Sequence, residues 1–168
     1  GSHPLFTILA VGGQYAGNPL RVIVAHISEV ACHGEDEVVA RTVGGDTAKL
    51  VFEDGHQFVY LHMEGPDECG HHGQIPEKVQ CIQDIDTKVI GPVMDYLQNC
   101  GEDYAVLVMP DHPTPLCLLT HVADPVPFAL VSSKHPMDNG NVVFNEHNAR
   151  STGLFVPRGC DLMEKLLG

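Results

Sequence analysis

The sequence predicts an α/β fold, because short apolar segments of strand length lie on either side of one long helical pattern. Four such segments are bounded by turn residues and are typical of buried strands: Leu20–Ile27, Gln57–His62, Tyr104–Met109 and Pro127–Val131. The helical pattern lies between the second and the third of them. Since a helix that connects two neighbouring strands of one sheet leaves them parallel, we expect a mostly parallel sheet flanked by helices.

The long helix is predicted over Ile75–Gln98. Pro76 suits its first turn, and the residues from Asn99 to Gly101 suit its end. The pair Gly91-Pro92 interrupts the pattern, which predicts a kink. The apolar positions that recur at helical spacing are Val79, Ile82, Val89, Ile90, Val93 and Leu97.

Two shorter helices are expected near the end of the sequence, over Asn145–Ser151 and Cys160–Leu167. The residues of the second that should face the core are Leu162, Met163, Leu166 and Leu167. Apart from the strand predicted at Leu20–Ile27, the first 50 or so residues are the least readable part of the sequence. We therefore leave residues 1–50 as an amino-terminal segment without assignment, an insert or a truncated element, and place the functional domain at residues 51–168.

The composition is that of an ordinary globular protein. Hydrophobic residues make up 43% of the 168 residues, and no apolar run approaches the roughly 18 residues of a membrane-spanning helix. Gly1-Ser2-His3 has the character of an expression-tag remnant, and no charged and apolar leader follows it, so we expect a soluble, cytoplasmic protein. The six cysteines are scattered without a CxxC pair, which favours reduced thiols.

The net charge narrows the range of partners. A formal charge of −13 is unfavourable for binding the phosphate backbone of nucleic acids, which requires lysine and arginine. The same charge suits divalent cations, although acidic surfaces also serve solubility. The carboxylates therefore indicate a metal site only where they are placed together with other ligands.

Carboxylate and imidazole groups concentrate in three short segments, each directly after or before a predicted strand. Asp67 and His71 lie four residues apart in a glycine-rich stretch that we interpret as a turn. Asp111 and His112 are adjacent between prolines that hold the backbone extended. His121 precedes the fourth strand. Because open α/β sheets place their sites at the carboxyl ends of strands, these groups could meet.

Mixed imidazole and carboxylate ligands favour manganese, zinc or magnesium over calcium, which prefers oxygen ligands alone. The competing interpretation is that each residue acts separately as a cap, a turn residue or a solvated group. His62, at the end of a predicted strand, is open to two interpretations, a core histidine or a residue that supports a metal ligand.

Two sequence blocks carry a resemblance to a known family. The string FVYLHMEGPDECGH at Phe58–His71 and the string PDHPTP at Pro110–Pro115, followed by Thr120–Phe128, resemble the cofactor-independent phosphoglycerate mutases of archaeal type. These enzymes belong to the alkaline phosphatase-like metalloenzymes. The resemblance extends over about two-thirds of the chain, from Asp54 to Leu167, and matches the carboxyl-terminal part of such enzymes.

The resemblance implies an alkaline phosphatase-like fold with two divalent metal ions (Mn, Zn or Mg). One ion would be held by Asp67, His71 and His121, and the other by Asp111 and His112. The implied reaction is the interconversion of 3-phosphoglycerate and 2-phosphoglycerate in glycolysis by phosphoryl transfer, without 2,3-bisphosphoglycerate. The expected partner is a small phosphorylated substrate.

One part of the family pattern has no match in this sequence. In the family an amino-terminal Asp and a phosphorylated Ser or Thr complete the second ion site, and no segment here corresponds to either. Ser28 follows an apolar run, but a serine in that place is typically a turn or cap residue, so we assign it no catalytic role. Two alternatives stay open: a metal-dependent hydrolase of the same superfamily, and a truncated domain without activity.

Overall fold

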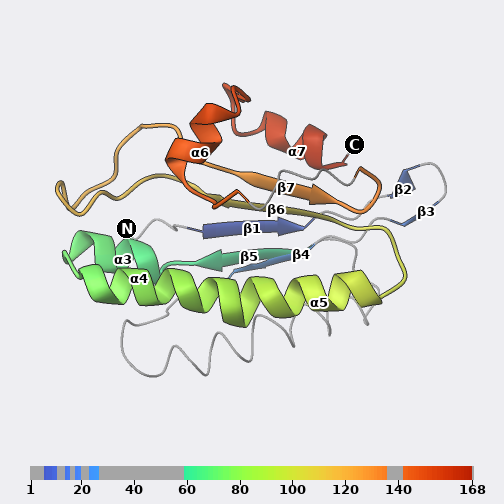
Figure 1. Ribbon diagram of the computed structural model, residues 1–168, viewed down its shortest axis with the longest axis horizontal. Helices are drawn as coiled ribbons and strands as arrows, with labels where there is room; N and C mark the ends of the chain where they lie inside the picture. Colours follow the sequence, from blue (N-terminus) through green and yellow to red (C-terminus); the bar gives the residue numbers. More distant parts are fainter. Residues whose placement is uncertain are drawn as a thin grey trace.

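The computed structural model describes residues 6–10, 14–15, 18–19, 23–26, 59–135 and 142–167. Its main feature is a five-stranded sheet, seen in Figure 1. The strands follow one another across the sheet in the order β4 (Ile23–His26), β5 (Val59–Met63), β1 (Phe6–Ala10), β6 (Ala105–Pro110) and β7 (Ala129–Ser132). A separate antiparallel pair is formed by β2 (Gln14–Tyr15) and β3 (Asn18–Pro19).

The directions of the strands differ from the expectation of a mostly parallel sheet, which is not confirmed. Among the described strands of the large sheet, only β4 and β5 pair in parallel, and the other three pairs are antiparallel. Two of these antiparallel pairs arise because β1 lies between β5 and β6 and runs against both, and the third arises because β7 runs against β6. The sequence of β1 carries no pattern that we recognised as a strand.

The two strands next to β1 nevertheless run in the same direction. Phe6 of β1 faces Met63 at the end of β5 and Pro110 at the end of β6. Both strands therefore finish at one edge of the sheet, as the helical connection between them predicts. Two of the three segments rich in carboxylate and imidazole, those of Asp67 and Asp111, begin just after these two ends.

Each of the four predicted strands corresponds to a strand of the structure, with ends that differ by a few residues. Parts of two predictions, at residues 20–22, 27 and 57–58, lie outside the described residues, as do Ser28 and Gly1 to His3. The strands β1 and β4 come from the unassigned amino-terminal segment and join the same sheet. The division of the chain at residue 50 stays a prediction.

The predicted long helix is present as three consecutive elements: α4 (Ile75–Asp84), a π-helical segment η2 (Ile85–Ile90) and α5 (Gly91–Asn99). The π-helical segment ends directly before the pair Gly91-Pro92, where the sequence predicts a kink. The amide of Gly91 donates to the carbonyl of Asp86, five residues back. Such a wider turn accommodates the ring of a proline, which cannot donate a backbone hydrogen bond.

Only one half of this helix contributes to the core. Of the positions that recur at helical spacing, Val89, Val93 and Leu97 are buried and Ile90 is half-buried, and Ile85 is buried as well. The apolar side chains of α4 are different, because Val79 is 51% exposed and Ile82 is 43% exposed. The helical spacing therefore corresponds to burial in η2 and α5 but not in α4.

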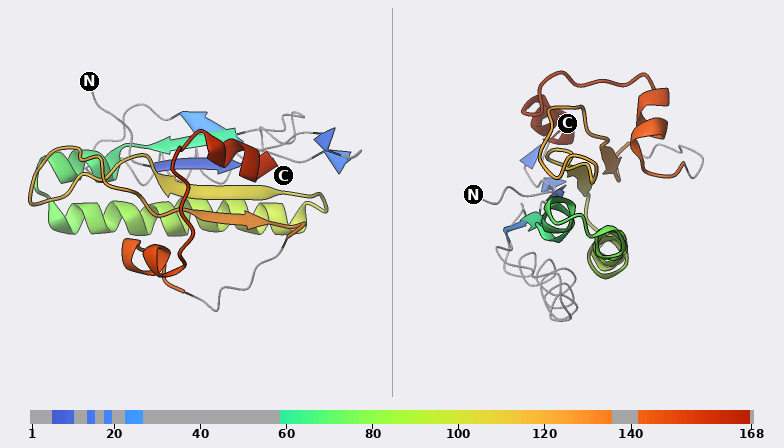
Figure 2. Two further views of the ribbon diagram at one scale, coloured as in Figure 1. Left: turned by 90° about the horizontal axis from the view of Figure 1, so that it is seen from above. Right: turned by 90° about the vertical axis from the view of Figure 1, so that its left-hand side faces the viewer.

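The sheet is covered by helices on both faces. Figures 1 and 2 show the helices α4 and α5 on one face and α7 (Asp161–Leu167) on the other. Leu162 and Leu166 of α7 are buried against Ala105 and Leu107, which alternate along one side of β6. The predicted inward positions Leu162 and Leu166 are confirmed, while the side chain of Leu167 lies outside the described part.

The predicted helix before α7 is also present as α6 (Glu146–Ser151). Its first turn is capped by Asn145, whose side-chain oxygen accepts a hydrogen bond of 2.8 Å from the amide of Asn148. No helix among the residues that the structure describes combines the length and the apolar character needed to cross a bilayer.

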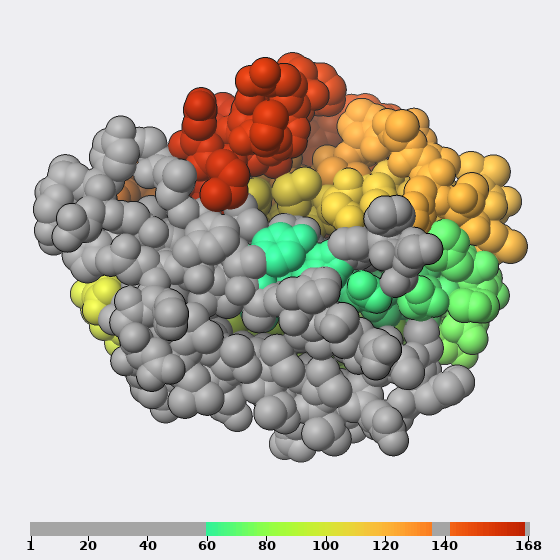
Figure 3. Space-filling model, turned by 180° about the vertical axis from the view of Figure 1, so that it is seen from behind, coloured from blue at the N-terminus to red at the C-terminus, as the bar shows by residue number. Residues whose placement is uncertain are grey.

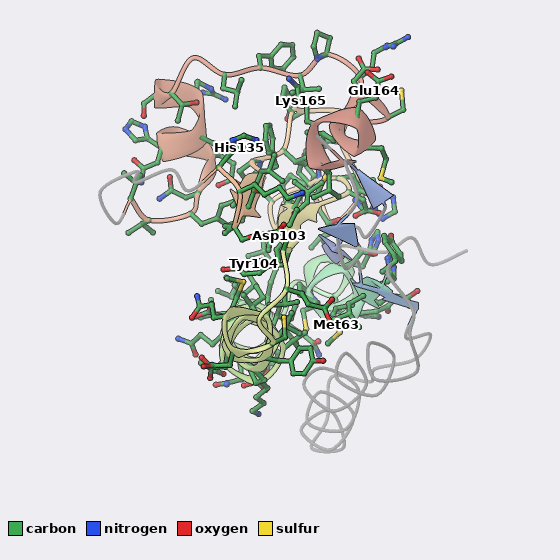
Figure 4. The ribbon with its side chains drawn as sticks, turned by 90° about the vertical axis from the view of Figure 1, so that its right-hand side faces the viewer. Met63, Asp103, Tyr104, His135, Glu164 and Lys165 are labelled. Atoms are coloured by element: carbon green, nitrogen blue, oxygen red, sulfur yellow. The ribbon has the colours of Figure 1, made fainter. Side chains whose placement is uncertain are left out.

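The packing of α7 gives a direct prediction about stability. Leu166 is 3% exposed, so Leu166→Ala should leave a cavity and lower the free energy of unfolding by about 2–5 kcal/mol. Urea unfolding followed by circular dichroism measures this change. The matched control is Glu164→Ala, since Glu164 is exposed on the same helix (Figure 4) and should change the value by less than about 0.5 kcal/mol. Equal effects of the two substitutions would contradict the observed packing of α7.

Candidate metal centre

The first two residues of the site come from a short helix that begins just after β5. The helix α3 extends over Gly65–His71, with Pro66 in its first turn. The prediction of a glycine-rich turn is therefore wrong. Asp67 and His71 still face the same place, as expected, but for a different reason. Residues four apart on a helix share one face, so Asp67 and His71 point in the same direction. Asp67 is completely buried, whereas the side chain of His71 is 32% exposed.

The remaining residues of the site come from the long connection between β6 and β7. Asp111 and His112 follow β6 directly. A turn over Pro115–Leu119 then reverses the chain, with the amides of Leu118 and Leu119 both donating to the carbonyl of Pro115. This turn returns the chain toward α3 and places His121 beside His71. In the space-filling view, the connection adjoins α3 and α4 at one end of the molecule (Figure 3).

Three side chains converge on one point. The Nε2 atom of His71 lies 3.3 Å from Oδ2 of Asp67, and Nε2 of His121 lies 3.3 Å from Oδ1 and 3.4 Å from Oδ2 of the same carboxylate. The two Nε2 atoms are 2.9 Å apart. Ligands placed about 2.0–2.2 Å from a tetrahedral zinc ion are separated from one another by roughly 3.3 Å. The donor set and its spacing therefore fit a single ion of this size.

A backbone carbonyl determines which nitrogen of His71 is available. The Nδ1 atom of His71 lies 3.0 Å from the carbonyl oxygen of Leu119, which can only accept, so Nδ1–H is the donor. In the neutral ring the lone pair is then on Nε2, the atom that faces Asp67 and His121. Leu119 adopts a positive φ of 55°, a conformation that is unusual for a residue other than glycine.

Asp111 and His112 form a second pair beside the first group. The backbone amide of His112 donates to Oδ1 of Asp111 at 3.0 Å, and Nε2 of His112 lies 3.6 Å from Oδ2. The ring of His112 packs against that of His121, with 3.8 Å between the ring centroids. The structure thus brings all five predicted residues to one place, with three converging on a point and two adjoining them.

The electrostatics of this place favour a cation. Burial raises the pKa of Asp111 above its ordinary value, the adjacent His112 opposes that effect, and the Asp67 carboxylate adds to it. The raised pKa means that the ionised form of Asp111 is unfavourable here, mainly because the group is partly buried and to a smaller extent because Asp67 lies nearby. A bound divalent ion would offset that penalty, because it attracts the ionised carboxylate.

Sequence reasoning missed two residues that contact the site. Thr114 is 2% exposed, and its hydroxyl donates a short hydrogen bond to Oδ1 of Asp67. The Nζ atom of Lys78, on α4, donates to the carbonyl oxygen of Thr114 at 2.8 Å. The only available signal was the flanking of Thr114 by Pro113 and Pro115, which restricts its backbone.

His62 is buried at the carboxyl end of β5. Its Nδ1 atom lies 2.9 Å from the hydroxyl of Tyr60, and the two rings stack with their centroids 5.7 Å apart. Both interpretations of this residue, a core histidine and a support for the site, predict burial. The choice between them therefore stays open.

The chain belongs to the metalloenzyme superfamily, whose family model matches residues 22–163. This superfamily has the alkaline phosphatase-like fold that the sequence motifs imply. The assignment agrees with the cluster of Asp67, His71 and His121, whose donor atoms all lie within 4.8 Å of one another.

Several relatives are named as 2,3-bisphosphoglycerate-independent phosphoglycerate mutases. A Geobacter sulfurreducens protein, named as a probable enzyme of this kind, is 45% identical over 124 residues, which are 74% of this chain and 31% of that protein. The Methanosarcina mazei and Methanothrix thermoacetophila proteins are 35% and 41% identical, each over 65% of this chain and 28% of their own length. The chain thus spans just under a third of these relatives. No solved structure matches it.

Proposed function

We propose that Asp67, His71 and His121 hold one divalent metal ion, and that Asp111 and His112 are ligands of a second. The observation that supports the first site best is the near-equal spacing of 2.9–3.4 Å among one carboxylate oxygen and two imidazole nitrogens. The side chains of His71 and His121 are 32% and 29% exposed, so both imidazoles are partly accessible from solvent.

The ligand types narrow the identity of the ions. Two neutral imidazoles with one carboxylate suit zinc or manganese, and a site with more oxygen ligands suits magnesium. The second pair, Asp111 and His112, offers one oxygen and one nitrogen, so further ligands must come from elsewhere. These considerations support two ions of the Mn, Zn or Mg class, with at least one site completed by other residues or by substrate.

For the reaction, we propose that the parent protein interconverts 3-phosphoglycerate and 2-phosphoglycerate without 2,3-bisphosphoglycerate. The support comes from the printed names of the relatives. When bound, the two ions would neutralise charge on the transferring phosphoryl group and activate an attacking hydroxyl. The residues of this chain would hold and orient those ions, while the hydroxyl nucleophile is not among the residues that we can assign.

The proposed metal site can be tested by metal binding alone, without an assay of enzyme activity. His121→Ala should reduce the affinity for Zn²⁺ or Mn²⁺ at least ~10-fold, because it removes one of three converging ligands. Isothermal titration calorimetry on chelator-treated protein measures the affinity, and bound metal can be counted by mass spectrometry. Asp111→Asn should leave the first ion in place and lower the affinity for a second.

The matched control for this prediction is His72→Ala. His72 is adjacent to the ligand His71, but its side chain is 66% exposed and contacts Glu68 of α3. Its removal should leave metal affinity within about twofold of the unaltered protein. If His121→Ala and His72→Ala behaved alike, the three-residue site would be refuted.

The reaction products separate the proposed activity from its alternatives. With 3-phosphoglycerate and Mn²⁺, a mutase yields 2-phosphoglycerate, whereas a hydrolase of the same superfamily yields glycerate and inorganic phosphate. We expect 2-phosphoglycerate from the full-length parent protein, detected by phosphorus NMR. Release of phosphate instead would favour the hydrolase, and metal binding without turnover would indicate a domain that retains the site but not the chemistry.

A further inference from the structure

The carboxylate of Asp67 has two oxygen atoms with different surroundings. Oδ2 lies 3.3 Å from Nε2 of His71 and 3.4 Å from Nε2 of His121, so it completes a nearly regular triangle with the two nitrogens. Oδ1 also lies 3.3 Å from Nε2 of His121, but it accepts the hydrogen bond from the hydroxyl of Thr114. Oδ2 lies close to both imidazole nitrogens and does not take this hydrogen bond, which favours Oδ2 as the oxygen that faces an ion.

The Thr114 hydroxyl also reaches the second pair of residues. Its Oγ1 atom lies 3.4 Å from Nδ1 of His112, a contact somewhat longer than a usual hydrogen bond. The hydroxyl gives its proton to Asp67, so its remaining lone pairs can only accept, and a contact with His112 requires a proton on Nδ1. The lone pair of neutral His112 is then on Nε2, which faces Asp111. One hydroxyl therefore touches a residue of each group.

Residues of the helices α4 and α3 hold Thr114 in its position. The ammonium group of Lys78 donates to the Thr114 carbonyl at 2.8 Å. Burial lowers the pKa of Lys78, while the nearby Asp67 carboxylate opposes that effect and so favours the charged ammonium. Lys78 and Thr114 both pack closely against Gly70 of α3, since a Cβ atom at Gly70 would lie 2.8 Å from Nζ of Lys78 and 2.9 Å from Cγ2 of Thr114. These contacts leave the Thr114 side chain little freedom to turn away.

We propose that Thr114 is a positioning residue that orients Asp67 and His112 together, and that Lys78 holds it in place through its carbonyl. The hydroxyl prevents the Asp67 carboxylate from rotating, so that a single oxygen, Oδ2, is presented to the ion between the two imidazoles. This inference rests on the proposed metal site. It adds a physical link between the two groups of ligands.

The test compares three substitutions at Thr114 by calorimetric titration of the chelator-treated chain with Zn²⁺ alone. Thr114→Val keeps the shape and removes the hydroxyl, so metal affinity should fall ~10-fold or more, the usual effect of losing a partner that orients a ligand. Thr114→Ser keeps the hydroxyl and should restore affinity to within about threefold of the unaltered chain. Thr114→Ala serves if the valine variant does not fold, and should resemble it.

The contribution of Lys78 is tested separately. Lys78→Met removes the donor to the Thr114 carbonyl and should lower affinity by a smaller factor, about threefold to tenfold, because the hydroxyl can still reach Asp67. Lys165→Met is the control, since Lys165 is exposed on α7 on the opposite face of the sheet (Figure 4). Thermal melts in chelator show that each variant is folded.

The outcomes distinguish this inference from the metal site on which it rests. If the unaltered chain bound no Zn²⁺, the proposed site itself would be overturned. If the chain bound Zn²⁺ and Thr114→Val bound it equally well, the positioning role would be wrong and the site would stand. Equal losses in the valine and serine variants would also overturn the role, because packing and not the hydroxyl would then be responsible.

Discussion

The arrangement of the site depends on one buried carboxylate. Asp67 has no exposed surface, and a charged group in that position is unfavourable unless hydrogen bonds and opposite charges surround it. Two imidazoles, a threonine hydroxyl and a nearby ammonium meet this requirement in part. A divalent ion between the carboxylate and the imidazoles would complete it. The fold makes this possible because β5 and β6 end at one edge of the sheet, where α3 begins and the β6–β7 connection starts.

Much of the fold could be predicted from local patterns, and the errors concern contacts between distant segments. Apolar runs and turn residues identified β5, β6, β7 and the long helix, because these signals are local. Strand order is not local, so the insertion of β1 between β5 and β6 had no signal in the sequence. The helical spacing of Val79 and Ile82 predicted the helix but not their exposure, since periodicity identifies one face of a helix without showing what covers it.

The site could likewise be predicted in part: the residue types of the ligands were recognisable from the sequence, but the contacts that arrange them were not. Asp67, His71, Asp111, His112 and His121 were recognisable because carboxylates and imidazoles carry the chemistry and lie near strand ends. The groups that orient them were not recognisable. Thr114 acts through a neutral hydroxyl, Lys78 through contact with a main-chain oxygen, and Leu119 through its own carbonyl. Such contacts follow from the path of the backbone, and residue type alone does not predict them.

A crystal structure of the chain grown with Zn²⁺ or Mn²⁺, with the ion located by its anomalous scattering, tests the central claim most directly. The account predicts an ion about 2.0–2.2 Å from Oδ2 of Asp67 and from the Nε2 atoms of His71 and His121, while Oδ1 keeps its hydrogen bond from Thr114. An ion bound elsewhere, or the three side chains turned away from one another in its presence, would contradict it.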